Sequence, residues 1–383
     1  MNHGTETGKT MNRAPTAPPR FGFCVPIFAY PGPALFRTPS YERLDARLSI
    51  DAAVECERLG YDSLWVADHF FHGHDGAILE GWTTLCVLAG LTRRIRLGSI
   101  HLCTGFRNPA LLAKMAATLD LLSNGRLIFF ADSGNRRAEF EAYDFPWHED
   151  SRVRNARMRE ALELILRLWR EDGPVTFAGQ HYAARDALCL PHPVQRPHPP
   201  LWLGETPDDV MLAAIADLAD GWNSTPATIA ELGGRLTRVE AACASAGRPF
   251  ADLELSLEIQ VLIAPTRERV EEQLDYAASL PAPAGSGVSY ADPASRAALY
   301  ARSLIGTPDE VVARIQEYRA LGVTHFMLWF MDFPRMDGVR LFAETVLPRM
   351  ASLSDQDVTT SNAQSVNSRL RDQHGDRSGG AGV

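Results

Sequence analysis

The chain has 383 residues, of which 45% are hydrophobic, so it can bury one large core or two ordinary ones. Its formal net charge is -9 and no run of Lys and Arg stands out, which argues against a nucleic-acid partner because phosphate binding needs clustered cations. No apolar run reaches about 18 residues, the length that a membrane span needs, and the N-terminus lacks an apolar leader, so we expect a cytoplasmic protein.

The six cysteines are scattered, without a C-x-x-C pair and without the spacing of metal ligands. We therefore predict no metal site, and mostly buried thiols in a reducing compartment. They are Cys24, Cys56, Cys86, Cys103, Cys189 and Cys243.

Both ends of the chain are predicted to be unstructured, because residues 1–19 are polar and proline-rich and residues 353–383 hold almost no large apolar side chain. Between them, in residues 20–352, strand patterns alternate with helix patterns. Strands are predicted at 21–26, 63–67, 94–102, 126–131, 200–204, 220–224, 253–264 and 324–330. Helices are predicted at 42–59, 81–91, 109–122, 154–170, 208–219, 229–246, 267–280, 307–321 and 337–350.

Several helix boundaries carry local signals. Gly60 follows the first helix where a residue with positive φ is favoured, and Pro109 suits the first position of a helix. Thr307 with Glu310 three residues later forms the pattern of a capping box. These signals predict where the chain turns between helix and strand.

Two segments interrupt the alternation. Residues 132–198 form an insertion with one long helix and a short strand candidate at Val175–Phe177, and a connection of that length is usually a wall or lid of a site. The Pro/Gly/Ser/Ala-rich stretch from Pro281 to about residue 298 is predicted to be a mobile loop. We expect the two together to exclude water from the site.

Eight strands alternating with helices predict an α/β protein with a (β/α)8 TIM barrel and insertions. The alternative is a doubly wound sheet with a second domain. The even spacing, and the absence of G-x-G-x-x-G after the first strand, favour the barrel.

The second predicted strand ends in Asp68 and His69. Catalytic groups in parallel α/β folds lie just past the carboxyl ends of strands, so His69 is a candidate acid or base, because imidazole is the side chain that commonly transfers protons near neutral pH. Asp68 either orients His69 or caps the turn that follows.

Five segments resemble the bacterial luciferase-like monooxygenase superfamily, in that family's order, over about residues 20–350. The resemblance implies a barrel that binds a reduced flavin or deazaflavin at the carboxyl ends of its strands, and relatives often pair through barrel helices, so a homodimer is a further expectation. The segments are 60–70, 107–127, 193–204, 216–223 and 306–326, beginning with GYDSLWVADHF.

The resemblance also implies roles for single residues. Asp68 and His69 correspond to a histidine pair beside the flavin, and Ile100 and His101 to contacts with its ring. His101 is a second acid or base candidate if it faces inward, which the strand period leaves open.

For the phosphate, the junction Gly204-Glu205-Thr206 is similar to the Ala-Glu-Ser of luciferase, which implies that the amides of Glu205 and Thr206 and the Thr206 hydroxyl bind the anion. Ser133 and Gly134 lie on the other flavin-facing loop. Ser133 takes the place of a phosphate-binding arginine, a role that Arg136 or Arg137 could fill.

Three functions remain open at this point. Our first hypothesis is a two-component bacterial monooxygenase that uses reduced FMN and O2 on a small organic substrate, with a separate flavin reductase. The alternative is hydride transfer with the deazaflavin coenzyme F420, and a third is a flavin-binding protein without catalysis. The sequence does not identify the substrate.

Overall fold

The structure is a computed structural model that describes residue 15 and residues 17–29, 38–73, 75–204, 208–280 and 292–352. The predicted C-terminal tail and most of the N-terminal tail lie outside the described residues, as does the predicted mobile loop up to residue 291. Those expectations therefore stay predictions.

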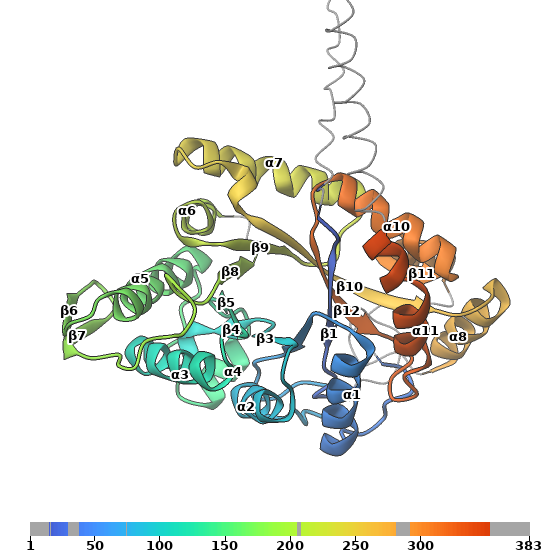
Figure 1. Cartoon of the computed structure of the whole chain (residues 1–383), viewed down its shortest axis with the longest axis horizontal. Helices are drawn as coiled ribbons and strands as arrows, with labels where there is room; N and C mark the ends of the chain where they lie inside the picture. The colour runs from blue at the N-terminus through green and yellow to red at the C-terminus, as the bar shows by residue number, and fades with distance from the viewer. Residues whose placement is uncertain are drawn as a thin grey trace, which may run out of the picture.

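Eight parallel strands form a closed ring, because β9 pairs with β10 and β12 pairs with β1 at the point where an open sheet would have two edges. Figure 1 shows this ring with helices around it. The predicted TIM barrel is confirmed, and the closure excludes the doubly wound sheet. The ring consists of β1 (Arg20–Cys24), β2 (Ser63–Val66), β3 (Arg96–Ser99), β5 (Leu127–Asp132), β8 (Leu201–Gly204), β9 (Gly221–Ser224), β10 (Glu254–Ile263) and β12 (His325–Phe330).

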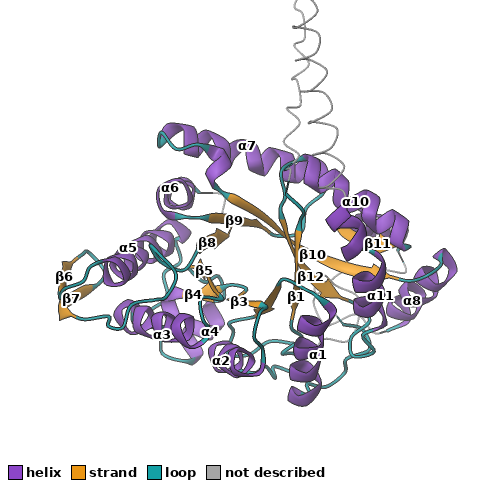
Figure 2. Ribbon diagram, viewed as in Figure 1, coloured by secondary structure: helices purple, strands orange, loops and turns teal. Residues whose placement is uncertain are grey.

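The outer layer of helices agrees with the sequence pattern within a few residues at most ends (Figure 2). It consists of α1 (Ala46–Leu59), α2 (Gly81–Leu91), α3 (Pro109–Leu122), α5 (Ser151–Arg170), α6 (Asp209–Leu218), α7 (Ile229–Ser245), α8 (Arg267–Ser279), α10 (Pro308–Ala320) and α11 (Asp337–Thr345).

The third predicted strand, 94–102, is wrong as one continuous strand. The chain turns at a cis peptide bond between Ile100 and His101, so that β3 ends at Ser99 and a two-residue strand, β4 (Leu102–Cys103), follows beside β5.

Other short elements were missed because they are too brief to show a period. In the insertion, β6 (Val175–Ala178) pairs antiparallel with the missed β7 (Ala183–Ala187) in a hairpin at the outer edge beside α5 (Figure 1). The predicted loop to residue 298 already includes the start of a helix. The remaining missed elements are η1 (Thr104–Phe106), α4 (Arg137–Ala142), η2 (Phe250–Asp252), α9 (Pro293–Ala301) and β11 (Ser303–Gly306).

Aromatic rings fill the inside of the barrel. Trp65 of β2 stacks on Trp202 of β8 with ring centroids 5.4 Å apart, and His325 of β12 meets both rings edge-on. All three side chains are buried. Because the interior is a packed core, only the strand ends are left to hold a ligand.

The predicted caps are confirmed. Gly60 has φ +90° and its amide closes the last turn of α1, and Thr307 and Glu310 exchange the two hydrogen bonds of a capping box at the start of α10.

All six cysteines are free thiols, of which only Cys86 is exposed. Across the part of the chain that the structure describes, no group of three or more His, Cys, Asp or Glu side chains is arranged to hold a metal ion. No helix among the described residues is long and apolar enough to cross a membrane.

Gly60→Ala should lower the free energy of unfolding by about 1 kcal/mol, because a side chain at φ +90° is strained although the surrounding space is open. Gly234→Ala is the matched control: Gly234 lies inside α7, also in open space but with ordinary helical geometry, so the same change there should raise stability by up to about 1 kcal/mol. Urea unfolding of both variants measures the difference, and equal effects would contradict the role given to Gly60.

Candidate active site

The carboxyl ends of β2, β4 and β5 enclose a small cavity of about 60 Å³. Five of the residues that the sequence singled out line it together: Asp68, His69, His101, Gly134 and Arg136. They come from three different strand ends and were far apart in the sequence. The structure therefore brings all three predicted catalytic residues, Asp68, His69 and His101, to one place.

His69 is held by a carboxylate that the sequence did not point to. Its Nδ1 lies 2.8 Å from Oε2 of Glu139 on α4, and the amides of Phe70 and Phe71 donate to the other oxygen of the same carboxylate. The Glu139 side chain is only 1% exposed, whereas the His69 side chain is 27% exposed. Glu139 therefore fixes the imidazole through Nδ1 and leaves the Nε2 edge of the ring free to face the cavity.

The charge of Glu139 follows from these contacts. Burial by itself would raise the pKa of Glu139, but the hydrogen bond and charge of His69, the Arg136 guanidinium and the Phe71 amide together hold that pKa below its ordinary value. An ionised carboxylate only accepts hydrogen bonds, so Nδ1 of His69 carries a proton and donates it to Glu139. Nε2 is then the nitrogen that can exchange a proton with a ligand.

Asp68 has different partners. Its two oxygens accept a bidentate pair of hydrogen bonds from Arg107 at 2.7 and 2.8 Å, and the Cys103 amide donates a third. Both charged side chains are largely buried. Asp68 therefore joins the end of β2 to β4 and to the start of α3, while Glu139 makes the contact with His69.

His101 points into the barrel mouth, toward Phe130 and Gly204. Its ring meets Phe130 edge-on at 4.4 Å, and a Cβ added at Gly204 would lie 3.5 Å from its Cδ2 and Nε2. Burial lowers the pKa of His101, the charge of Asp132 raises it in part, and a protonated His69 lowers it further. His101 is thus a neutral imidazole at neutral pH. Ile100, beside it, is buried in the core.

Below His101 lies an unpaired polar atom. Asn223 of β9 is fully buried; its amide nitrogen donates to Ser256 Oγ at 2.9 Å, but its Oδ1 has no hydrogen-bond partner. The Asn223 side chain also interacts with His101, where its hydrogen-bonding effect raises the pKa of the ring in part. A buried acceptor without a donor costs stability, and such atoms often mark a ligand site.

The loop after β5 is tied to the insertion. Ser133 Oγ donates to Asn155 of α5 at 2.6 Å, and the Asn155 amide nitrogen donates to Asp208 at 2.6 Å. Gly134 has φ +82°, and a Cβ there would lie 2.7 Å from Phe140 and 2.8 Å from Cys103. The loop therefore requires glycine at this position for both its backbone and its packing.

The phosphate junction is only partly visible. Gly204 ends β8, whereas Glu205 and Thr206 lie outside the described residues, so their predicted roles stay predictions. The two acids that follow do not point freely at an anion: Asp208 caps α6 through the Met211 amide, and Asp209 pairs with Arg152.

The two arginines proposed for the phosphate also have partners. Arg137 pairs with Glu141 and Glu149 on the surface. Arg136 lines the cavity and contacts His72 at 2.7 Å. Of the pair, only Arg136 lies beside the predicted catalytic residues.

Sequence reasoning missed Glu139, Arg107 and Asn223. Glu139 lies on a helix of six residues with no clear period, and the spacing between each of these residues and its partner exceeds 30 positions, so no local pattern links them. A buried carboxylate needs a hydrogen-bond donor, so the sequence could predict that a buried acid has a partner. It could not predict which residue that partner is.

The chain resembles known proteins over most of its length. A family described as luciferase-like monooxygenase matches residues 33–325. An F420-dependent glucose-6-phosphate dehydrogenase of Amycolatopsis mediterranei (strain U-32) is 31% identical over 331 residues, covering 82% of this chain and 97% of that protein. A protein of the same description from Beutenbergia cavernae is 31% identical over 338 residues, covering 83% and 97%.

Solved structures show the same fold. The monooxygenase RslO1 from Streptomyces bottropensis has a TM-score of 0.69 and 26% identity, and covers 86% of this chain and 99% of its own. Below 25% identity, where likeness shows the fold alone, the matches include both an F420-dependent secondary alcohol dehydrogenase and an EDTA monooxygenase.

These relatives overturn our first hypothesis. The expected oxygenation by reduced FMN and O2, with a separate reductase, is wrong: the more identical curated relatives are F420-dependent dehydrogenases. The junction Gly204-Glu205-Thr206 could not distinguish the two cofactors. A phosphate site contacts only the tail of the cofactor, whereas flavin and deazaflavin differ in the ring.

Asp68→Asn should lower the free energy of unfolding by about 3–5 kcal/mol, since it leaves the buried Arg107 guanidinium without its carboxylate. Glu80→Gln is the matched control, because Glu80 contacts the same guanidinium at 3.0 Å but its side chain is 44% exposed, so the loss there should be below about 1 kcal/mol. Urea unfolding measures both, and a small effect of Asp68→Asn would show that this pair is not what joins β2 to β4.

Proposed function

The chain belongs to the luciferase-like monooxygenase family, and from that premise we propose that it is an F420-dependent oxidoreductase that removes hydride from a hydroxyl-bearing small molecule. Hydride chemistry is supported most directly by sequence identity. The chain is 31% identical to F420-dependent dehydrogenases over 97% of their length. The chain is an oxidoreductase of this family and acts on a small molecule.

The residues at the barrel mouth fit a deazaflavin ring. The side chains of Asn223 and His101 offer hydrogen-bonding groups without net charge, which suits the hydrogen-bonding edge of a heteroaromatic ring. Ile100 and His101 would lie along the ring, and the junction that begins at Gly204 would hold the phosphate. Bound deazaflavin supplies the two-electron acceptor that the reaction needs.

His69 is the residue that we propose to move the proton. Removing hydride from an alcohol carbon requires that the hydroxyl proton leave as well, and Nε2 of His69 can accept it because Nδ1 is already committed to Glu139. The buried Glu139 carboxylate then stabilises the imidazolium that forms. Asp68, bound to Arg107, keeps the strand end that carries His69 in place.

The function is tested by titrating the protein with F420 and with FMN, and by following F420 reduction without oxygen. Glucose 6-phosphate and simple secondary alcohols are the first substrates to try, because both present a hydroxyl on a carbon that can lose hydride. F420 should bind and be reduced anaerobically. Reduction that requires O2 and FMN, or no binding of F420, would refute the proposal.

A cytoplasmic location stays a prediction.

His69→Ala should leave F420 binding within about twofold and lower turnover on the order of 100-fold, the usual contribution of a positioned acid or base. His181→Ala, at the turn of the β6–β7 hairpin and not among the residues that line the cavity, is the control and should not change turnover. If turnover of His69→Ala stays at the wild-type level, His69 is not the proton acceptor.

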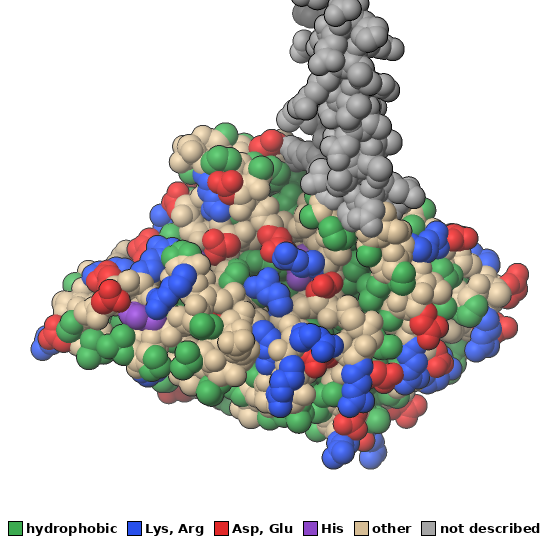
Figure 3. Space-filling model, in the orientation of Figure 1, with side chains coloured by type: hydrophobic (Ala, Val, Ile, Leu, Met, Phe, Trp, Pro, Cys, Tyr) green, Lys and Arg blue, Asp and Glu red, His purple; other side chains and the backbone are tan. Residues whose placement is uncertain are grey.

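A second copy of the chain is the partner that we propose for the face formed by α2 and α3. Charged side chains of both signs are scattered over the face in Figure 3, as expected of a surface in water. The exposed sides of α2 and α3 differ, because Lys114 is the one charged side chain on them, and it donates to the Leu190 carbonyl. A helix that is apolar all round is normally buried.

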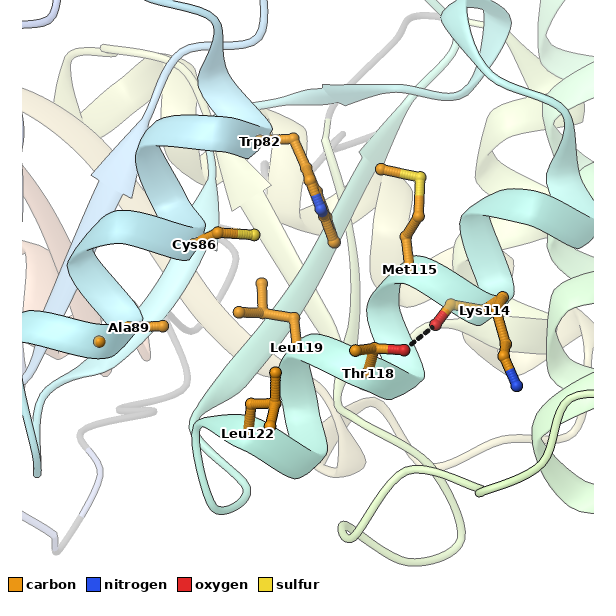
Figure 4. A pocket seen from close by; sticks show the side chains of 9 residues that line it. Trp82, Cys86, Ala89, Lys114, Met115, Thr118, Leu119 and Leu122 are labelled. Carbon is orange, nitrogen blue, oxygen red and sulfur yellow. Dashed lines mark hydrogen bonds between the residues drawn. The ribbon is translucent and has the colours of Figure 1, made fainter.

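The shape of this face also suits a copy of itself. Side chains of α2 and α3 point toward one another across a groove of about 370 Å³ lined by Trp82, Met115 and Leu119 (Figure 4). Leu122, at the rim, is 78% exposed. In a twofold pair the leucines of each copy meet the groove of the other. α3 is about 21 Å long, enough with α2 and the apolar segment 188–194 for an interface of ordinary size.

Leu122→Glu should convert a dimer into a monomer, because it places a charge inside the apolar contact that Leu122 would make with the partner copy. Leu48→Glu on α1 is the control, since Leu48 is also exposed, at 42%, but lies outside this face. Light scattering after size exclusion gives the mass of each. A wild-type monomer, or a dimer that survives Leu122→Glu, contradicts the interface.

A further inference from the structure

A carboxyl group lies inside the barrel on the side away from His69, and the proposed reaction does not use it. Glu258 lies on β10, where Ser256 and Glu258 contact inward side chains of the neighbouring strands and Leu257 and Ile259 face the helices. Glu258 is 6% exposed. Its Oε1 accepts a hydrogen bond of 2.7 Å from the Trp329 indole on β12. Among the residues that the structure describes, the group is therefore buried with a neutral donor and without a paired cation.

The surroundings of Glu258 hold few charges. Burial raises its pKa to about 7, and the Trp329 hydrogen bond offsets part of that rise. The neighbouring Cys24 thiol on β1 has a pKa raised well above its ordinary value, by burial and then by the charge of Glu258, so it stays neutral. On β9 the nearby group is the uncharged Asn223.

Deeper in the barrel, toward the amino ends of the strands, are two more titratable groups. His325 of β12 and Glu254 of β10 lie 3.3 Å apart, and the carboxylate also pairs with Arg20 at 3.0 Å. Burial by itself would raise the pKa of Glu254, but His325, Arg20 and Arg96 hold it below its ordinary value, so Glu254 stays ionised near neutral pH. Glu258 is then the carboxyl of this strand that changes charge there.

Packed side chains connect Glu258 with the catalytic side of the mouth in two directions. Trp329 packs on Phe28 at 5.8 Å, Phe28 on His72 at 4.4 Å, and His72 on His69 at 5.1 Å. In the other direction, Met327 is the partner of Glu258 in the strand register and accepts from the Asn223 amide at 3.5 Å.

We propose that Glu258 is a ligand-facing acid, which takes up a proton from the solvent when the ring of bound F420 covers it and then donates a hydrogen bond to that ring. The proposal rests on the proposed function, because it needs a ring that fills the barrel mouth. The proton comes from water or buffer, and no other bond is made or broken.

The sign of the effect follows from burial. A ring over Glu258 removes its remaining contact with water and raises its pKa above the free value of about 7. Below that free value the acid is neutral in both states and binding is strongest. As the pH rises from about 7 toward the bound pKa, affinity should fall, by at most about tenfold per pH unit for one proton.

Calorimetric titration of the full chain with oxidised F420, in two buffers of different ionisation heat, measures the proton count directly. Near pH 7 the wild type should take up a measurable fraction of a proton per F420, because a group near its pKa is partly ionised. Glu258→Gln keeps the shape and the acceptor for Trp329 but cannot titrate, so it should take up none. Cys24→Ser is the control and should behave as the wild type.

A second variant tests the same idea if Glu258→Gln does not fold. Trp329→Phe removes the donor that favours the ionised carboxylate, so the pH at which affinity begins to fall should move upward. An unmoved pH profile in Trp329→Phe, or equal proton uptake by Glu258→Gln and the wild type, overturns the inference and leaves the proposed function standing. No binding of F420 by the wild type refutes both.

Discussion

Every charged group that the closed barrel buries at its carboxyl rim must have a partner there, and this constraint organises the site. Three of the acids that the barrel buries meet the requirement differently: Asp68 through a guanidinium, Glu139 through an imidazole and Glu258 through an indole. The kind of partner decides the charge, because a cation keeps a carboxylate ionised whereas a neutral donor in an apolar place does not.

The three pairings separate structure from chemistry. The Asp68–Arg107 pair holds strand ends together, and both Asp68 oxygens are already engaged by Arg107 and the Cys103 amide. Glu139 is equally buried, but its histidine reaches the cavity, so its charge can act through His69. Glu258, with little competing charge around it, is left as the acid that can respond to what covers it. Glu139 and Glu258 are thus the acids to which we assign a function, because neither is paired with a buried guanidinium as Asp68 is.

The barrel fold does not decide which cofactor the protein uses. A barrel of this family can hold ring cofactors for oxygenation or for hydride transfer, so architecture alone does not choose between them. The choice made here comes from the relatives with the higher identity, which are F420-dependent dehydrogenases. The uncharged groups at the mouth, Asn223 and His101, agree with a ring of either kind and add no preference.

The sequence by itself determined the eight barrel strands, most of their helices, the caps at Gly60 and Thr307, and the position of His69 at a strand end, because these depend on short-range periods and turn chemistry. It could not find Glu139 or Arg107, nor decide whether His101 faces inward, since the closed ring joins residues that lie tens of positions apart. Only the tertiary structure decided which carboxylate meets which partner. The physical reason is that burial and pairing, which set the charge of each acid, exist only once the strands have closed around them.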